Sequence, residues 1–173
     1  MPFVQQPRNN LHTSIMAKGI DAIYSLLERT KRIDTLLSDG TLMRDAVVMY
    51  ERDIAAENAA TMFKGERSDG SRIEPPYSPK TIAIKRAKRH PYDRVTLRDT
   101  GSFQGNLYLE YNEEGFEITS SDWKANPNST GRGIPLQAKY GDLIFGLQQR
   151  SIDAFAPMVA TALLASMRKI LEQ

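Results

Sequence analysis

The chain has 173 residues, of which 40% are hydrophobic, and a formal net charge of +2 with a pI near 8.8. This hydrophobic content is enough for a folded core, whereas the charge is too mild to indicate a nucleic-acid-binding protein from composition alone. The lack of cysteine excludes disulfides and thiolate metal sites, and neither a signal peptide nor a window of about 20 apolar residues is evident, so we expect a soluble intracellular product with no membrane partner.

The N-terminal third is predicted to be helical. Residues 1–12 combine prolines and amides without a structural period, which indicates a flexible arm that is either frayed or ordered on a partner. From residue 13 to about 38, apolar residues recur every three or four positions, which predicts one long amphipathic helix that stops at Gly40. A second, alanine-rich helix is predicted over residues 42–64, so that 13–64 forms either a helical hairpin about Gly40 or one interrupted rod.

Residues 65–173 are predicted to form a mixed α+β domain, which begins with a polar loop over 65–76. Residues 78–89 predict a short basic helix, because Pro79 falls at the first helical position, where its missing N–H costs nothing. Alternating apolar residues over 102–111 predict a strand, and Gly115 is expected to turn the chain into a second strand.

The remainder of this domain is predicted to be a polar loop, a strand and a helix. The loop covers residues 121–133, and a last strand is expected within 134–147. A final amphipathic helix, capped by Ser151 or Asp153, completes the chain. The expected fold class is therefore α+β, with a small antiparallel β-sheet flanked by long N-terminal helices and a C-terminal amphipathic helix.

The residues offer no recognisable catalytic constellation. The two histidines, His12 and His90, lie far apart and lack metal-ligand spacing, and the chain has no phosphate-binding or dinucleotide-binding glycine motif. No Gly-x-Ser-x-Gly motif occurs either. We therefore expect no cofactor and no enzymatic activity, with an enzyme whose site escapes recognition as a minor alternative.

The strongest concentration of charge lies between residues 80 and 98. Such a basic segment can neutralise phosphates, but it is more often a solvated face or a salt-bridged subunit contact. The candidate DNA-facing or interface residues are Lys80, Lys85, Arg86, Lys88, Arg89, Arg94 and Arg98.

Three short motifs occur in a fixed order along residues 65–173. They are YSPKT at 77–81, LRDTGSF at 97–103 and IFGL at 144–147, the last of them before the C-terminal helix. In their order and spacing they resemble the motifs of the tailed-bacteriophage virion morphogenesis and tail-completion proteins, the head-tail joining family. The resemblance implies a structural virion protein without catalytic residues, assembled in the bacterial host cytoplasm.

This resemblance also implies partners. Such a protein would form a homo-oligomeric ring at the neck or the head-proximal end of the tail, and would contact portal, adaptor or tail-tube proteins and the DNA that passes through the ring. A DNA-binding accessory protein that uses residues 80–98 is the alternative.

Two further sets of residues are singled out by their types. Asp99, Thr100 and Gly101 are expected to shape a turn, with Asp99 bonding the local backbone and Gly101 supplying unusual dihedral angles. Large apolar residues on the helices and the single tryptophan are candidates for a subunit interface, with core packing as the alternative. These candidates are Ile23, Leu27, Leu36, Trp123, Phe155 and Leu163.

Overall fold

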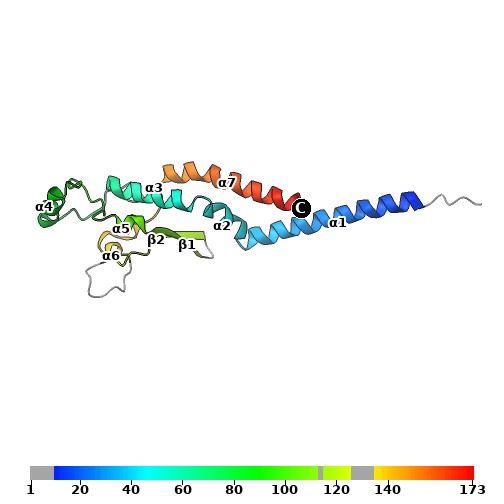
Figure 1. Ribbon diagram of the computed structural model, residues 1–173, viewed down its shortest axis with the longest axis horizontal. Coiled ribbons are helices and arrows are strands. Elements are labelled where there is room, and N and C mark those ends of the chain that lie inside the picture. The colour runs from blue at the N-terminus through cyan, green and yellow to red at the C-terminus, as the bar shows by residue number, and fades with distance from the viewer. Residues whose placement is uncertain (1–9, 113–114, 126–134) are drawn as a thin grey trace, which may run out of the picture.

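The computed structural model describes residues 10–112, 115–125 and 135–173, and it is elongated (Figure 1). The first helix, α1 (Asn10–Ser38), projects from one end of the body, and the short helix α4 (Pro79–Ala87) lies at the other end. Between them, α2 (Thr41–Val48), α3 (Glu51–Lys64) and α7 (Gln149–Leu171) run beside a two-stranded sheet. The predicted α+β fold class, with a small antiparallel sheet flanked by helices, is confirmed.

The long first helix is confirmed, although it begins at Asn10, inside the predicted arm. Residues 1–9 of that arm lie outside the described residues. Gly40 adopts a left-handed conformation with φ 75°, which ends the first helical segment as expected. The single helix expected over 42–64 was wrong, because the chain turns a corner at Met49 and Tyr50 between α2 and α3. This corner lets α2 lie against α7 while α3 lies against the sheet.

The C-terminal helix α7 returns along the body to α2 and α1. Ile33, Leu42 and Ile170 form a small buried cluster where these three helices meet, and Leu36, Leu163 and Met167 pack around it. Neither Ser151 nor Asp153 caps the helix, because Gln148 precedes its first turn and the Ser151 hydroxyl donates to Glu57 Oε1 instead.

By length and composition, α7 is apolar enough to cross a membrane. This corrects the expectation that no such window exists. One helix of this kind is weak evidence for a membrane span, since the core helix of an ordinary globular protein meets the same criterion. In this fold α7 packs along α2 and α1, but only 6% of its apolar window is buried, so it is not a core helix of that kind.

The sheet is a hairpin of β1 (Leu107–Asn112) and β2 (Gly115–Ser120), in which Leu107 pairs with Ser120. The predicted hairpin is confirmed, and Gly115 has a positive φ of 142°. The first strand starts later than predicted, because residues 102–105 form the short helix α5 (Ser102–Gly105) after the left-handed Gly101.

The strand predicted within residues 134–147 was wrong. The described part of this segment forms α6 (Leu136–Tyr140) and the 3-10 helix η1 (Asp142–Ile144). Gly141 and Gly146 both have positive φ and so interrupt any extended run. The predicted polar loop at 121–133 is described only as far as Ala125.

Two buried clusters hold the body together. In the first, Phe103 of α5 and Tyr140 of α6 pack with Ile144, Met62 and Val95. In the second, Leu109 and Ile118 of the sheet pack against Val47 and Ile54 of α2 and α3. The three sequence motifs therefore contribute to one core, because Tyr77, Leu97, Phe103, Ile144 and Phe145 all belong to or pack against the first cluster.

Candidate functional site

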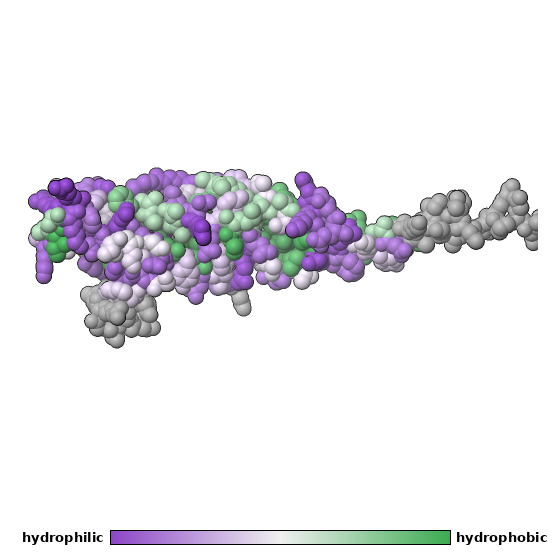
Figure 2. Space-filling model, viewed as in Figure 1, coloured by the Kyte–Doolittle hydropathy of each residue, from purple (hydrophilic) through white to green (hydrophobic). Residues whose placement is uncertain are grey.

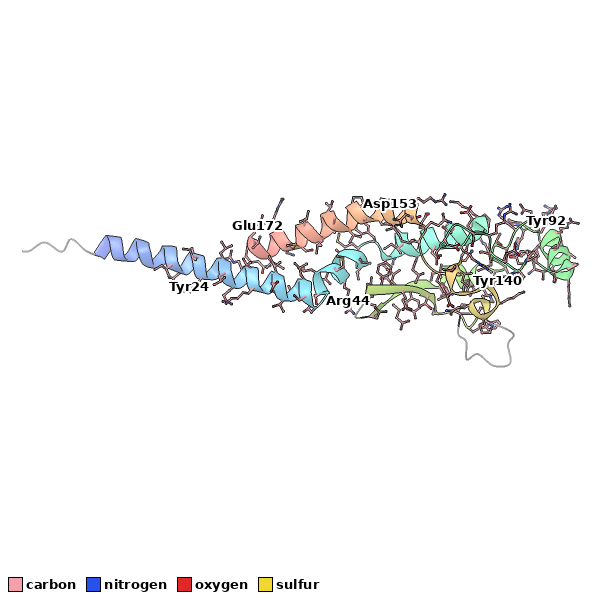
Figure 3. All side chains as sticks on the ribbon, turned by 180° about the vertical axis from the view of Figure 1, so that it is seen from behind. Tyr24, Arg44, Tyr92, Tyr140, Asp153 and Glu172 are labelled. Atoms are coloured by element: carbon pink, nitrogen blue, oxygen red, sulfur yellow. The ribbon has the colours of Figure 1, made fainter. Side chains whose placement is uncertain are left out.

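The basic segment forms the end of the molecule around α4. Ser78 caps this helix by accepting a hydrogen bond from the Thr81 amide at 3.3 Å, and Pro79 occupies the first turn, as the sequence predicts. Hydrophilic residues gather at this end of the surface in Figure 2, and Figure 3 labels Tyr92 there. The arrangement collects cations of residues 80–98 at one tip, although not all of them face the solvent.

Lys85 is turned into the protein. It is only 6% exposed, its Nζ donates to the Arg98 carbonyl at 2.6 Å, and it lies 4.8 Å from the centre of the Tyr77 ring. A buried ammonium with these partners joins α4 to the residues before the turn. Its role here is structural, and it cannot contact a phosphate in this conformation.

Two arginines of the segment pack on one aromatic ring. The guanidinium groups of Arg94 and Arg98 lie 5.8 and 5.5 Å from the centre of Phe63, and Arg94 Nε donates to the Phe63 carbonyl at 3.1 Å. Such cation–π contacts fix the side chains against the end of α3.

The exposed cations of the tip are Lys80, Arg86, Lys88, Arg89 and Arg98, of which Arg98 packs on Phe63. Arg86 stacks on Tyr92 at 4.5 Å, and Lys88 donates to Asp99 Oδ1 at 2.6 Å. The hydrogen bond from Lys88 lowers the pKa of Asp99 below its usual value. Lys80 and Arg89 make no ion pair with the described residues, so their charges are available to an anionic partner.

The turn at residues 99–101 differs in part from the expectation. Gly101 has φ 90°, which confirms its unusual backbone, and Thr100 Oγ1 accepts from the Ser102 amide at 3.3 Å. Asp99, however, bonds Lys88 rather than the local backbone.

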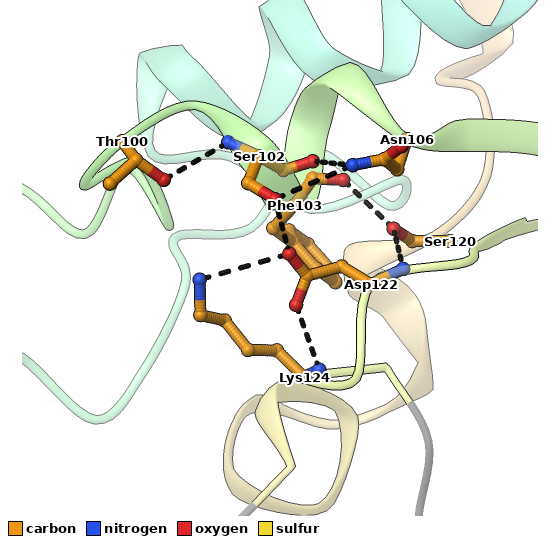
Figure 4. A network of polar contacts seen from close by, with 7 residues as sticks. All are labelled: Thr100, Ser102, Phe103, Asn106, Ser120, Asp122 and Lys124. Carbon is orange, nitrogen blue, oxygen red and sulfur yellow. Dashed lines mark hydrogen bonds and ion pairs between the residues drawn. The ribbon is translucent and has the colours of Figure 1, made fainter.

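A polar network holds this turn to the end of the hairpin (Figure 4). The Ser102 hydroxyl donates to Asp122 Oδ2 at 2.6 Å, and the Lys124 amide donates to Asp122 Oδ1 at 3.0 Å. Burial raises the pKa of Asp122, but these hydrogen bonds together with the nearby Lys124 charge outweigh it, and the net shift is downward. Sequence reasoning missed this aspartate, although an Asp two residues before a turn amide is a usual sign of local backbone bonding.

The six predicted interface residues separate into two groups. Leu36, Phe155 and Leu163 pack against buried clusters of their own chain, and Trp123 is half-buried with the Lys124 ammonium 5.7 Å from its ring. Ile23 and Leu27 are 68% and 46% exposed. Only these last two lie on an open surface.

The exposed apolar surface is larger than those two residues. On α1 it also includes Ile20, Tyr24 and Leu26, all at least half exposed, and Figure 3 labels Tyr24 on the projecting part of this helix. On α7, apolar side chains are exposed along its length, and Leu164 is the most exposed of them at 64%. Hydropathy colouring shows such residues at the surface along the body (Figure 2).

The concave features of the surface contain no evident reaction centre. A groove of about 510 Å³ lies beside β2, and another of about 480 Å³ lies between the hairpin and α2 with the two residues that precede α2. Within the described ranges, no group of three His, Cys, Asp or Glu side chains could hold a metal ion. The surfaces that could bind a partner are therefore the basic tip and the apolar faces of α1 and α7. No family model, curated protein or solved structure matches the chain.

Proposed function

We propose that the chain is a structural virion protein of a tailed phage, a tail-completion or neck component that assembles into a ring joining tail to head. The order of the three sequence motifs suggests this role, and their shared position in one core is compatible with it. The observation that carries the proposal is the apolar surface of residues 20–27 on α1, where five large side chains are exposed. Monomeric proteins seldom leave such a patch uncovered, whereas subunits of an assembly cover it with one another.

The mass of the purified protein in solution tests self-assembly directly. Light scattering should give a multiple of the 19.5 kDa chain at high protein concentration. Ile23→Glu should return it to the monomer, because a charge in an apolar contact is costly to bury. Arg32→Glu adds the same side chain nine residues later, on the opposite face of α1, and should assemble normally. A monomeric wild type, or equal disruption by both variants, would contradict assembly through this face.

The role in the virion has its own test. In a host that produces the encoding phage, a stop codon early in this gene should leave DNA-filled heads and tails that do not join. Expression of the wild-type chain from a plasmid should restore infectious particles, and expression of Ile23→Glu should not. Undiminished yield of joined particles without the gene would overturn the proposal.

Contact with DNA is a second candidate function, and the exposed cations of the α4 tip favour it. Lys80, Arg86 and Arg89 face the solvent, and Lys80 and Arg89 have no ion-pair partner in the described part of the chain. Replacing these three with glutamate should remove retention on DNA at low salt, because electrostatic binding depends on the number of phosphates neutralised. The matched control reverses Arg29, Arg32 and Lys31 on α1, and retention unaffected by the tip variant would exclude this function.

A further inference from the structure

The outer edge of β2 is an open strand edge. The Ser121 amide donates to the Asn106 carbonyl at 3.1 Å, and the hydrogen-bonded pairs of an antiparallel ladder alternate, so in β2 residues 119 and 117 bond to β1. The backbone groups of Phe116 and Ile118 therefore point away from β1. The opposite strand agrees with this assignment, since the outward amide of Leu109 donates to Glu51 rather than to β2.

No described residue pairs with this edge. The outward backbone groups of Phe116 and Ile118 have no hydrogen-bond partner in the described part of the chain. Among its six residues, β2 has no proline and one charged side chain, Glu117, so it lacks most of the features that normally protect an edge strand. Such an edge can accept an extended peptide as an additional strand.

The space beside the edge fits an extended peptide. The groove of about 510 Å³ is walled on one side by β2 and on the other by Phe145, Leu147 and Ile152. Its charged lining residues are Glu110, Glu117 and Asp142, with no lysine or arginine among them. The groove therefore favours a short peptide that has apolar side chains and carries positive charge.

The N-terminal segment of this chain has that chemistry. Residues 3–6 read FVQQ, without charge, and lie between Pro2 and Pro7, which would limit a strand to these four positions because proline cannot donate to a ladder. Phe and Val favour strands. Arg8 follows, and residues 1–9 contain no acidic side chain.

This segment cannot reach the groove of its own chain. It precedes α1, whose 29 residues extend about 43 Å at 1.5 Å per residue, and α1 runs away from the sheet in Figure 1. The C-terminal end of α1 is the end nearest the hairpin, because Gly40, two residues after it, lines a shared pocket with Tyr111 and Phe116. From residue 3 to Asn10 the extended chain spans at most about 25 Å, which is too short for a return to β2.

We propose that residues 3–6 of a second copy of this chain add as a strand to the outer edge of β2. The inference rests on the self-assembly proposed above and names one of its contacts. In this arrangement each subunit projects α1 past a neighbour, and the segment before α1 pairs with Phe116 and Ile118 of that neighbour. Arg8 then lies near the carboxylates of the groove.

Disulfide trapping tests the pairing without interference, because the chain has no cysteine. One chain, enlarged by a tag, carries Val4→Cys or Gln5→Cys, and the other carries Glu117→Cys. Side chains alternate between the two faces of a strand, so one of the two donor positions should cross-link to position 117 several-fold faster than the other. The control acceptor is Asp53→Cys on the exposed side of α3, which should trap neither donor.

Light scattering on the same samples separates the two proposals. Assembly with equal or no trapping at positions 4 and 5 overturns strand addition and leaves self-assembly intact. Trapping of Glu117→Cys with itself would show that two β2 edges pair directly, which also overturns the proposed occupant. A chain that remains monomeric overturns both proposals.

Discussion

At the residue scale, Asp122 should contribute measurably to stability. Its side chain is 5% exposed, and its carboxylate accepts hydrogen bonds from the Ser102 hydroxyl and the Lys124 amide, so it ties α5 to the end of the hairpin. In Asp122→Asn, an amide nitrogen replaces one of these acceptor oxygens and the negative charge is lost, so one hydrogen bond to a charged group is removed and the other is weakened. We expect the free energy of unfolding at pH 7 to fall by about 1–3 kcal/mol, measured by urea denaturation.

The same substitution should change the dependence of stability on pH. The pKa of Asp122 is lower in the folded state than its unfolded value of about 3.9, so on acidification the unfolded chain binds the proton first. Its contribution is therefore present above about pH 4 and disappears as the pH falls through the folded pKa. Asp122→Asn should make the free energy of unfolding fall less steeply as the pH is lowered below about 4. Asp45→Asn, on the exposed face of α2, should leave this pH dependence unchanged. Identical acid profiles for the two variants would contradict the assignment.

Residue types predicted local conformation better than side-chain direction. Gly101 and Gly115 have the positive φ expected of them, because that preference follows from the missing Cβ and needs no tertiary information. Lys85 shows the opposite case: within a run of cations nothing distinguishes the one that donates to Arg98 and packs on Tyr77. Which side of α4 becomes buried depends on residues 77 and 98, which the fold brings to it.

At the scale of elements, the cap of α4 should decide whether the basic tip is ordered. Ser78 is the only side-chain cap of this nine-residue helix. Ser78→Ala should lower the free energy of local opening of α4 by about 1 kcal/mol, so its amides should exchange about fivefold faster. Global stability should change little, because few elements pack on this helix. Ser78→Asn keeps an acceptor oxygen and should behave as the wild type. Equal exchange in all three proteins would show that the cap does not limit opening of the helix.

Elements with a strong period were predicted well, and those set by tertiary contacts were not. The apolar stripe of residues 13–38 and the hairpin about Gly115 carry their own signals and were found. The corner at Met49 and Tyr50 contains no glycine or proline that would predict it from the sequence. It forms because α2 packs on α7 whereas α3 packs on the sheet. The apolar residues of 134–147 are typical of a strand, but Gly141 has a positive φ and interrupts it. Tyr140 and Ile144 are instead buried in the first cluster from two short helices.

At the scale of the whole molecule, the projecting half of α1 should be ordered only in the assembly. Arg29 Nη1 donates to the Leu171 carbonyl at 2.8 Å, which marks where α7 ends beside α1, and α1 extends beyond this point alone (Figure 1). Helical segments of this length are marginal in water without packing partners.

We therefore expect the amides of residues 20–27 to exchange rapidly in dilute protein and to become protected as concentration rises, because association stabilises only the state that it binds. The amides of residues 54–62 in α3, which include the buried Ile54 and Met62, should be protected at every concentration and serve as the internal control. Ile23→Glu should abolish the concentration dependence, whereas Arg32→Glu should preserve it. Protection of residues 20–27 that is independent of dilution would mean that α1 is stable without a neighbour, and its apolar face would then need another partner.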